Sequence, residues 1–259
     1  MRLLSWNVQS CRGMDGAVDA ARIAAEARHL ADPDILCLQE LADDELARQF
    51  PGYAAFYAWG VDMPAGAGGR SRFGNLLLSR LPVGRVRRHS LPWPDSPGAP
   101  SMPRVAVEAV IESPSGPLRV VTTHLEYYSA EHRTAQVGRL RAIHAESRGA
   151  RQPVAEAGPF AMPAPLPRSA ILCGDFNFPP QDPLHRRIRE AGFADAWQVL
   201  HPAKPHPPTF RLHEKEREQA PYCCDFIFVT QDLVPRLRSI RIDADTQASD
   251  HQPVVLELS

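Results

Sequence analysis

Short apolar segments recur along the whole chain, and many of them run directly into a polar residue. Segments of this length, bounded by Gly, Pro, Asn or Asp, are typical of β-strands. Two longer segments, 17–30 and 130–147, space their apolar residues as amphipathic helices do. Strand, helix and strand therefore alternate, which predicts an α/β protein rich in sheet. The predicted strands are 3–8, 35–38, 53–59, 76–78, 83–87, 105–111, 118–123, 169–172, 225–229, 238–242 and 253–258.

The chain has 259 residues, of which 44% are hydrophobic, so it can bury a large core. Sheet-rich domains of this length are common, and we expect a single domain over residues 1–259. Short helices are predicted at 43–49 and 183–190. Two segments fall outside the apolar pattern. Residues 60–72 form a Gly-rich loop, and residues 149–168 form a Pro- and Ala-rich loop or insertion.

The formal net charge is only -1, from 29 Lys and Arg against 30 Asp and Glu, so charge does not mark a protein that coats nucleic acid. No apolar run approaches the ~20 residues that span a membrane, and we expect no membrane partner. Five cysteines are scattered without zinc or disulfide spacing. These features indicate a cytoplasmic protein, which we expect to be a monomer.

One polar motif, Gly174-Asp175-Phe176-Asn177, follows the strand predicted at 169–172. Its carboxylate and amide lie two residues apart, so on an extended segment they point to the same side. Gly, Asp and Asn also form turns, so the motif alone leaves a turn as an equal alternative. Similar polar residues border other predicted strands: Asn7, Glu40, His124, Asp225, Asp250 and His251.

Together these strand-end residues comprise four carboxylates, two amides and two imidazoles, without a Ser or Cys nucleophile among them. Oxygen-rich clusters suit a hard cation such as Mg2+ or Mn2+, which offsets the repulsion between carboxylates. Such a cation also polarises a phosphate oxygen and lowers the pKa of an attacking water. His251 is then the candidate proton acceptor, and a separate carboxylate such as Asp225 would orient it.

Each of these residues also has an ordinary structural explanation. The two amides fit loop residues that bond their own backbone, and Glu40 fits the first turn of a helix. Asp225 fits a surface strand end, His124 a buried core histidine, and Asp250-His251 a turn before the last strand. The hypothesis of a functional site therefore depends on the joint pattern.

Six motifs in this order span almost the whole chain. They are Ser5-Trp6-Asn7-Val8-Gln9, Leu38-Gln39-Glu40, Thr123-His124-Leu125, Gly174-Asp175-Phe176-Asn177, Cys224-Asp225-Phe226-Ile227-Phe228 and Ser249-Asp250-His251-Gln252-Pro253. The set resembles the endonuclease/exonuclease/phosphatase superfamily, which includes pancreatic deoxyribonuclease. The resemblance implies a four-layer α/β sandwich, in which two mostly antiparallel sheets pack face to face with helices outside. It also implies a divalent-metal-dependent phosphoester hydrolase with its site at one end of the sandwich.

The resemblance implies roles for the matching residues. The implied metal ligands are Glu40, Asn7 and Asp250. The implied catalytic residues are His251 and Asp225 as the base dyad, Asp175 and Asn177 around the attacking water and the phosphate, and His124 at the phosphate or leaving group.

Four further residues match recurring positions of the superfamily. Asn75 and Arg104 are implied to approach the phosphate of the substrate. Arg133 and Gln136 follow a pattern of many bacterial members, although for Arg133 we favour a solvated helix face.

Two departures bear on the substrate. Abasic-site nucleases of the superfamily usually carry an acidic residue where this chain has Gln9, and a Tyr where it has His124. These departures favour general phosphodiester or phosphomonoester substrates. One alternative is a nuclease that acts on DNA or RNA, which predicts a basic groove for the nucleic acid. The groove would comprise Arg70, Arg72, Arg85, Arg87 and Arg88. The other alternative is a non-catalytic binding protein, which need not keep the complete set of site residues.

Overall fold

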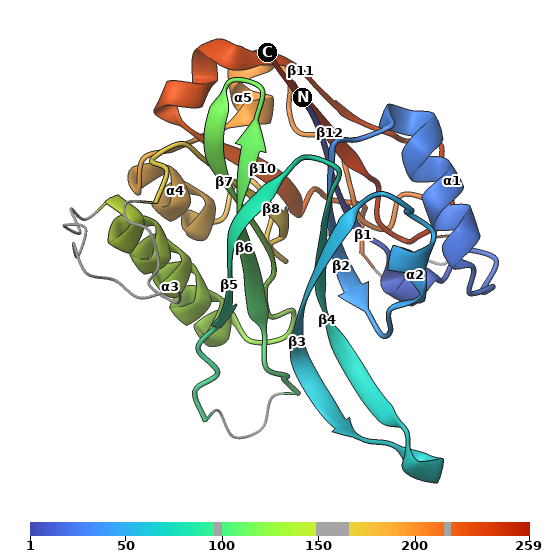
Figure 1. Ribbon diagram of the computed structural model, residues 1–259. Helices are drawn as coiled ribbons and strands as arrows, with labels where there is room; N and C mark the ends of the chain where they lie inside the picture. Colours follow the sequence, from blue (N-terminus) through green and yellow to red (C-terminus); the bar gives the residue numbers. More distant parts are fainter. Residues whose placement is uncertain (96–99, 149–165, 215–218) are drawn as a thin grey trace, which may run out of the picture.

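Two six-stranded β-sheets face each other in the computed structural model, and helices cover their outer faces (Figure 1). The structure describes residues 1–95, 100–148, 166–214 and 219–259. The first sheet has the order β11-β12-β1-β2-β4-β3, with β1 (Arg2–Asn7), β2 (Ile35–Leu41), β3 (Ala54–Pro64), β4 (Arg70–Ser79), β11 (Leu237–Ile242) and β12 (Val254–Leu258). The second has the order β5-β6-β7-β8-β10-β9, with β5 (Val83–Ser90), β6 (Val105–Ser113), β7 (Gly116–His124), β8 (Ala170–Asp175), β9 (Phe193–Asp195) and β10 (Asp225–Thr230).

Each sheet contains one parallel strand pair near its centre. A helix, α1 (Ala20–Ala31), connects β1 to β2, and α3 (Ala130–Arg148) lies between β7 and β8. The other strand pairs are antiparallel. Because the two parallel pairs end at the same edge of the sandwich, their carboxyl ends bring polar side chains together there.

The apolar runs of the sequence are buried on both faces, which explains why they are continuous rather than alternating. In β2, Ile35 and Cys37 face the core between the sheets, whereas Leu36 and Leu38 pack toward α1. Helices α3 and α4 (Pro183–Glu190) cover the second sheet, as α1 and the short α2 (Glu45–Arg48) cover the first (Figure 1). The predicted four-layer α/β sandwich is therefore confirmed.

The segment 60–72, predicted as a loop, is largely a β-hairpin. Strands β3 and β4 pair from Ala54 with Ser79 to Pro64 with Arg70, with a register shift between Trp59 and Val61. A 3-10 turn, η2 (Gly66–Gly68), forms the tip. The hairpin projects beyond both sheets (Figure 1). Its outer half lacks a buried apolar face, so the apolar pattern did not reveal it.

Several short elements were also absent from the sequence prediction. They include β9, helix α5 (Ala196–Leu200) and the 3-10 turns η1 (Gln9–Cys11) and η3 (Gln231–Arg236). Elements this short carry too few residues for a clear period. The Pro- and Ala-rich segment predicted as a loop lies outside the described residues, apart from 166–168.

All five cysteines are buried and free of disulfides, as their spacing predicts. Within the described ranges, none of the helices combines the length and the apolar character needed to cross a membrane.

Candidate active site

The strand-end residues predicted from the sequence meet at one edge of the sandwich. Asn7 and His124 are the last residues of β1 and β7, and Asp175 is the last residue of β8. Asp225 opens β10, which runs antiparallel to β8, so that Asp225 and Asp175 are register partners. His251 precedes β12, which runs antiparallel to β1, and therefore reaches the same edge.

The Asn7 side-chain amide lies at the centre of this group. Its Nδ2 atom donates hydrogen bonds to Glu40 Oε1 and to Asp175 Oδ2, each at 3.0 Å, and lies 3.4 Å from His251 Nε2. Its Oδ1 atom accepts a hydrogen bond from the Gln9 backbone amide at 3.1 Å. Asn7 therefore holds the carboxylates of Glu40 and Asp175 near each other. The role of Asn7 as a metal ligand stays a prediction.

Glu40 reaches the site from an irregular part of β2. The pairing of β2 with β4 shifts between Leu38 and Leu41, and Glu40 itself has a φ of 61°. A non-glycine residue in this region of backbone space is uncommon and often marks a functional position. The Glu40 side chain is 25% exposed, against 1% for Asp175, so it forms the solvent side of the pair.

Both carboxyl groups are less acidic than ordinary carboxyl groups. Burial raises the pKa of Glu40, and the charge of Asp250 raises it further. Burial also raises the pKa of Asp175, against the opposing charge of His251. Ionised carboxylates held this close repel one another, which a bound cation would offset.

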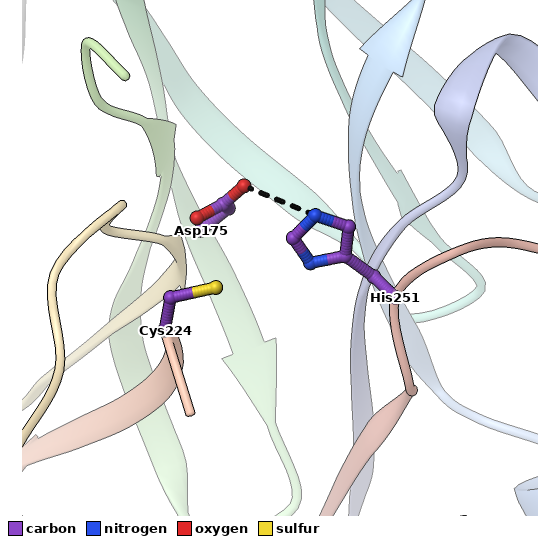
Figure 2. A group of neighbouring side chains, drawn as sticks. All are labelled: Asp175, Cys224 and His251. Carbon is purple, nitrogen blue, oxygen red and sulfur yellow. Dashed lines mark ion pairs between the residues drawn. The ribbon is translucent and has the colours of Figure 1, made fainter. Parts of the chain in front are cut away.

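His251 is fixed between two carboxylates. Its Nδ1 atom donates to Asp225 Oδ2 at 2.9 Å, and its Nε2 atom lies 3.6 Å from Asp175 Oδ2. The ring stacks on Phe210, with centroids 4.4 Å apart and planes inclined by 28°. Figure 2 shows Asp175 and His251 directed toward each other, with the Cys224 side chain beside them.

The neighbouring carboxylates also determine the pKa of His251. Burial alone would lower the pKa of His251, but Asp225 and Asp175 outweigh burial and raise it. A cation bound by Asp175 would oppose the contribution of that carboxylate. The Asp225 contact would remain, because it is made at the other ring nitrogen.

A second group of polar side chains lies across Asp175 from His251. The Arg104 guanidinium lies 3.1 Å from His124 Nδ1, and His124 Nε2 lies 3.3 Å from Asp175 Oδ2. Burial and the charge of Arg104 lower the pKa of His124, so its ring is neutral. Asn177 Nδ2 lies 3.0 Å from His124 Nε2 and donates to the Leu125 carbonyl at 2.8 Å.

The remaining predicted residues lie farther toward the rim or within the core. Asp250 Oδ2 accepts a hydrogen bond from Gln9 Nε2 at 2.9 Å, so Gln9 is part of the site. Asn75 is 2% exposed and donates to the Val105 carbonyl, which ties β4 to β6 across the two sheets. Its contact with substrate stays a prediction.

Arg133 does not lie on a solvated helix face, in contrast to the interpretation favoured from the sequence. It is half-buried and donates to the carbonyls of Glu126 and Tyr127, at 2.9 and 2.5 Å. Gln136 is buried and accepts a hydrogen bond from the Glu126 backbone amide. Both residues therefore fix the chain that follows His124.

Sequence reasoning missed three residues that hold the dyad. Thr209 donates its hydroxyl to Asp225 Oδ2 at 2.6 Å, Phe210 stacks on His251, and Trp6 Nε1 donates to the His251 carbonyl at 2.9 Å. Trp6 lies beside Asn7 in the motif Ser5-Trp6-Asn7-Val8-Gln9. Thr209 and Phe210 lie in a loop between α5 and β10, where only the tertiary fold brings them to the site.

The donor set fits a hard divalent cation. Glu40 and Asp175 present carboxylate oxygens to the same Asn7 nitrogen, and the Asp250 charge acts on Glu40. Asp175, Cys224 and His251 also offer donor atoms within 4.8 Å of one another. Burial raises the pKa of Cys224, which keeps its thiol protonated, so carboxylate oxygens dominate the available donors.

Comparison with known proteins agrees with the fold. The model of the endonuclease/exonuclease/phosphatase family matches residues 4–251. The chain therefore belongs to this family. No match to the chain is found among curated proteins.

Solved structures share the fold at low sequence identity. An endonuclease/exonuclease/phosphatase protein from Beutenbergia cavernae is 23% identical, with a TM-score of 0.74 over 99% of this chain and 70% of its own. A mannosyl-6-phosphatase from Bacteroides thetaiotaomicron is 18% identical, with a TM-score of 0.74 over 100% and 99% of the two chains. A 3′ phosphatase from Neisseria, bound to a product DNA hairpin, is 20% identical, with a TM-score of 0.67 over 100% and 99%.

Proposed function

We propose that this protein is a Mg2+- or Mn2+-dependent phosphoester hydrolase that uses water as the nucleophile. The observation that carries the proposal is the position of Asp175 Oδ2. It lies 3.6 Å from His251 Nε2 and 3.0 Å from the Asn7 nitrogen, and that nitrogen is also 3.0 Å from Glu40. A general base, a carboxylate and a candidate metal ligand thus surround one small volume.

Glu40 and Asp175 would hold the cation, with Asp250 as a further carboxylate near Glu40. When bound, the cation would polarise a phosphate oxygen and lower the pKa of the attacking water. Side chains of the protein would then transfer the proton and orient the attacking water.

His251 and Asp225 would manage the proton of the attacking water. With a cation offsetting the charge of Asp175, the neutral His251 ring would accept the proton at Nε2, while Asp225 holds the other ring nitrogen at 2.9 Å. The Asp225 carboxylate then stabilises the imidazolium that forms. Thr209 keeps Asp225 in that orientation through its 2.6 Å hydrogen bond.

The group across Asp175 would bind the phosphoryl oxygens. Arg104 would supply positive charge, the Asn177 amide would supply an N–H donor, and the His124 ring lies between the two. Donors fixed before the reaction stabilise charge that develops on phosphate oxygens.

Charge pairing favours a small phosphoester over nucleic acid. Of the arginines predicted to form a basic groove, Arg70 and Arg72 pair with Asp62 on the β3–β4 hairpin. Arg87 pairs with the buried Glu108. Of the solved structures named above, one is a mannosyl-6-phosphatase by name, which agrees with a small ester. The 3′ phosphatase is bound to a product DNA hairpin, which keeps nucleic acid as the alternative. We therefore propose phosphomonoesters and small phosphodiesters as the substrate class.

The test is a screen of aryl phosphodiesters, aryl phosphates, sugar phosphates, DNA and RNA with Mg2+ or Mn2+. Asp175→Asn serves as the blank and Asp15→Asn, at an exposed carboxylate paired with Arg22, as the matched control. We expect hydrolysis of a small ester by the wild type and the control, and a loss of at least roughly 100-fold in Asp175→Asn. Full activity in Asp175→Asn would overturn the proposal. Cleavage confined to nucleic acid and falling steeply with salt would favour the nuclease alternative.

A further inference from the structure

A second cluster of titratable side chains lies outside the candidate active site. It consists of His185 on α4, Asp195 at the end of β9, and His206 in the loop that follows α5. The donor atoms of all three residues lie within 4.8 Å of one another. Their side chains are 3%, 1% and 6% exposed, so the cluster is buried.

Both histidine rings are directed at one carboxylate oxygen. His185 Nε2 and His206 Nε2 each lie 2.8 Å from Asp195 Oδ2. The other oxygen, Oδ1, accepts hydrogen bonds from the backbone amides of Trp197 and Gln198 at the start of α5. Asp195 is thereby fixed by the helix that it caps, with Oδ2 left for the two imidazoles.

The surroundings of the cluster are aromatic. The ring of Phe226 lies 5.1 Å from His185 and 5.5 Å from His206, and Phe228 lies 5.2 Å from His185. Among the described side chains, the two imidazoles are the only groups that pair with Asp195. The Asp195 carboxylate is therefore buried in an aromatic shell, where a charge is costly unless it is paired.

We propose that His185, Asp195 and His206 bind a divalent transition-metal ion, for which Zn2+ is the best chemical match. Two imidazole nitrogens and one carboxylate oxygen are ligands that Zn2+ accepts, whereas Mg2+ and Ca2+ prefer oxygen. At the usual Zn2+ bond lengths, tetrahedral ligand atoms lie about 3.3 Å apart, so the two 2.8 Å separations need to widen by only roughly half an ångström.

The cluster supplies three protein ligands. His206 also lines a cavity of about 590 Å³, together with Cys223 and Tyr222, and a water from this cavity would be the fourth ligand.

The bound ion would join three segments behind the candidate active site. Phe226 packs on both histidine rings and directly follows Asp225 in β10. His206 is connected through Pro207 and Pro208 to Thr209, which bonds Asp225. The ion thus has a structural role, because it fixes the loop that orients the dyad from the opposite face of the sheet.

The test compares metal content in protein produced without a histidine tag, stripped with a chelator and dialysed against Zn2+ with excess Mg2+ present. The variants are His206→Gln and His185→Gln. The controls are Asp175→Asn, which alters the candidate active site, and His201→Gln, which alters another histidine lining the same cavity. Titration with Co2+, followed by its visible absorption, reports nitrogen coordination independently of activity.

We expect one equivalent of Zn2+ in the wild type and both controls, and at least roughly tenfold weaker binding in His206→Gln and His185→Gln. Zn2+ should also raise the Tm of the wild type. If the wild type retains no more Zn2+ than His206→Gln, the cluster is only hydrogen-bonded and the proposal is wrong. If Asp175→Asn abolishes Zn2+ binding, the ion belongs to the candidate active site. If a variant fails to fold, the wild-type Tm and Co2+ spectrum still show whether the protein binds the ion through nitrogen ligands.

Discussion

Asp225 shows how one side chain of the site is held in a single orientation. Its Oδ2 atom accepts hydrogen bonds from Thr209 at 2.6 Å and from His251 at 2.9 Å. The Thr209 hydroxyl in turn accepts hydrogen bonds from the backbone amides of Cys224 and Asp225, at 3.1 and 3.2 Å. Thr209 is therefore a positioning residue that acts on His251 through Asp225.

Replacing Thr209 by Val removes the hydroxyl but keeps the shape of the side chain. Hydrogen bonds to charged groups contribute about 1.5–3 kcal/mol, so we expect kcat to fall roughly 10- to 100-fold with little change in KM. Thr209→Ser keeps the hydroxyl and should retain most of the activity. Steady-state kinetics on the substrate found in the screen check this, and equal kcat values for the Val and Ser variants would contradict it.

At the scale of elements, Gly174 lets strand β8 lie close to β7. Its φ is +134°, and a Cβ placed there would lie 1.9 Å from the Thr123 carbonyl oxygen. Thr123 is the register partner of Gly174 in the parallel pair that delivers His124 and Asp175 to the site. Glycine is thus required for this pairing.

We expect Gly174→Ala to destabilise the protein by at least about 3 kcal/mol, because a backbone clash adds to the strain of the positive φ. Gly138→Ala is the matched control. Gly138 lies in helix α3 with open space around its Cα, and Ala there should stabilise the helix by roughly 0.5–1 kcal/mol. Urea denaturation measures both changes. A Gly174→Ala midpoint equal to that of the wild type would show that the strands tolerate a side chain.

A buried ionic cluster links strands β5, β6 and β7 away from the site. Glu108 is 1% exposed and contacts His89 at 2.7 Å, Arg87 at 2.8 Å and Arg119 at 2.9 Å. Burial alone would raise the pKa of Glu108, but hydrogen bonds from His89 and Arg119 outweigh burial and lower the pKa to about 2.

A lowered carboxyl pKa stabilises the folded state at pH values above the ordinary pKa of the group. This stabilisation is lost as the pH falls toward the folded pKa. Between about pH 5 and about pH 2, we expect the wild type to lose up to roughly 3 kcal/mol more than Glu108→Gln in its free energy of unfolding. Denaturation curves at several pH values measure the difference, and parallel losses in the two proteins would rule out this role for Glu108.

At the scale of the whole molecule, the sequence predicted the layers and the site edge because both depend on local patterns. Ile35 and Leu36 lie in a continuous apolar run that requires cover on both faces, and Asp175 and His251 border such runs. The β3–β4 hairpin escaped prediction because its outer half packs on no apolar layer. Thr209 escaped because only the fold, and no local motif, brings it to Asp225.

In the proposed function, Glu40 and its neighbours hold a catalytic cation. The most direct measurement is the rate of phosphoester hydrolysis as a function of Mg2+ concentration, for the wild type and for Glu40→Gln. We predict no hydrolysis after chelation, full recovery with Mg2+ in the wild type, and a half-saturating Mg2+ concentration at least roughly tenfold higher in Glu40→Gln. Full hydrolysis in the presence of chelator, or the same Mg2+ dependence in both proteins, would contradict the claim.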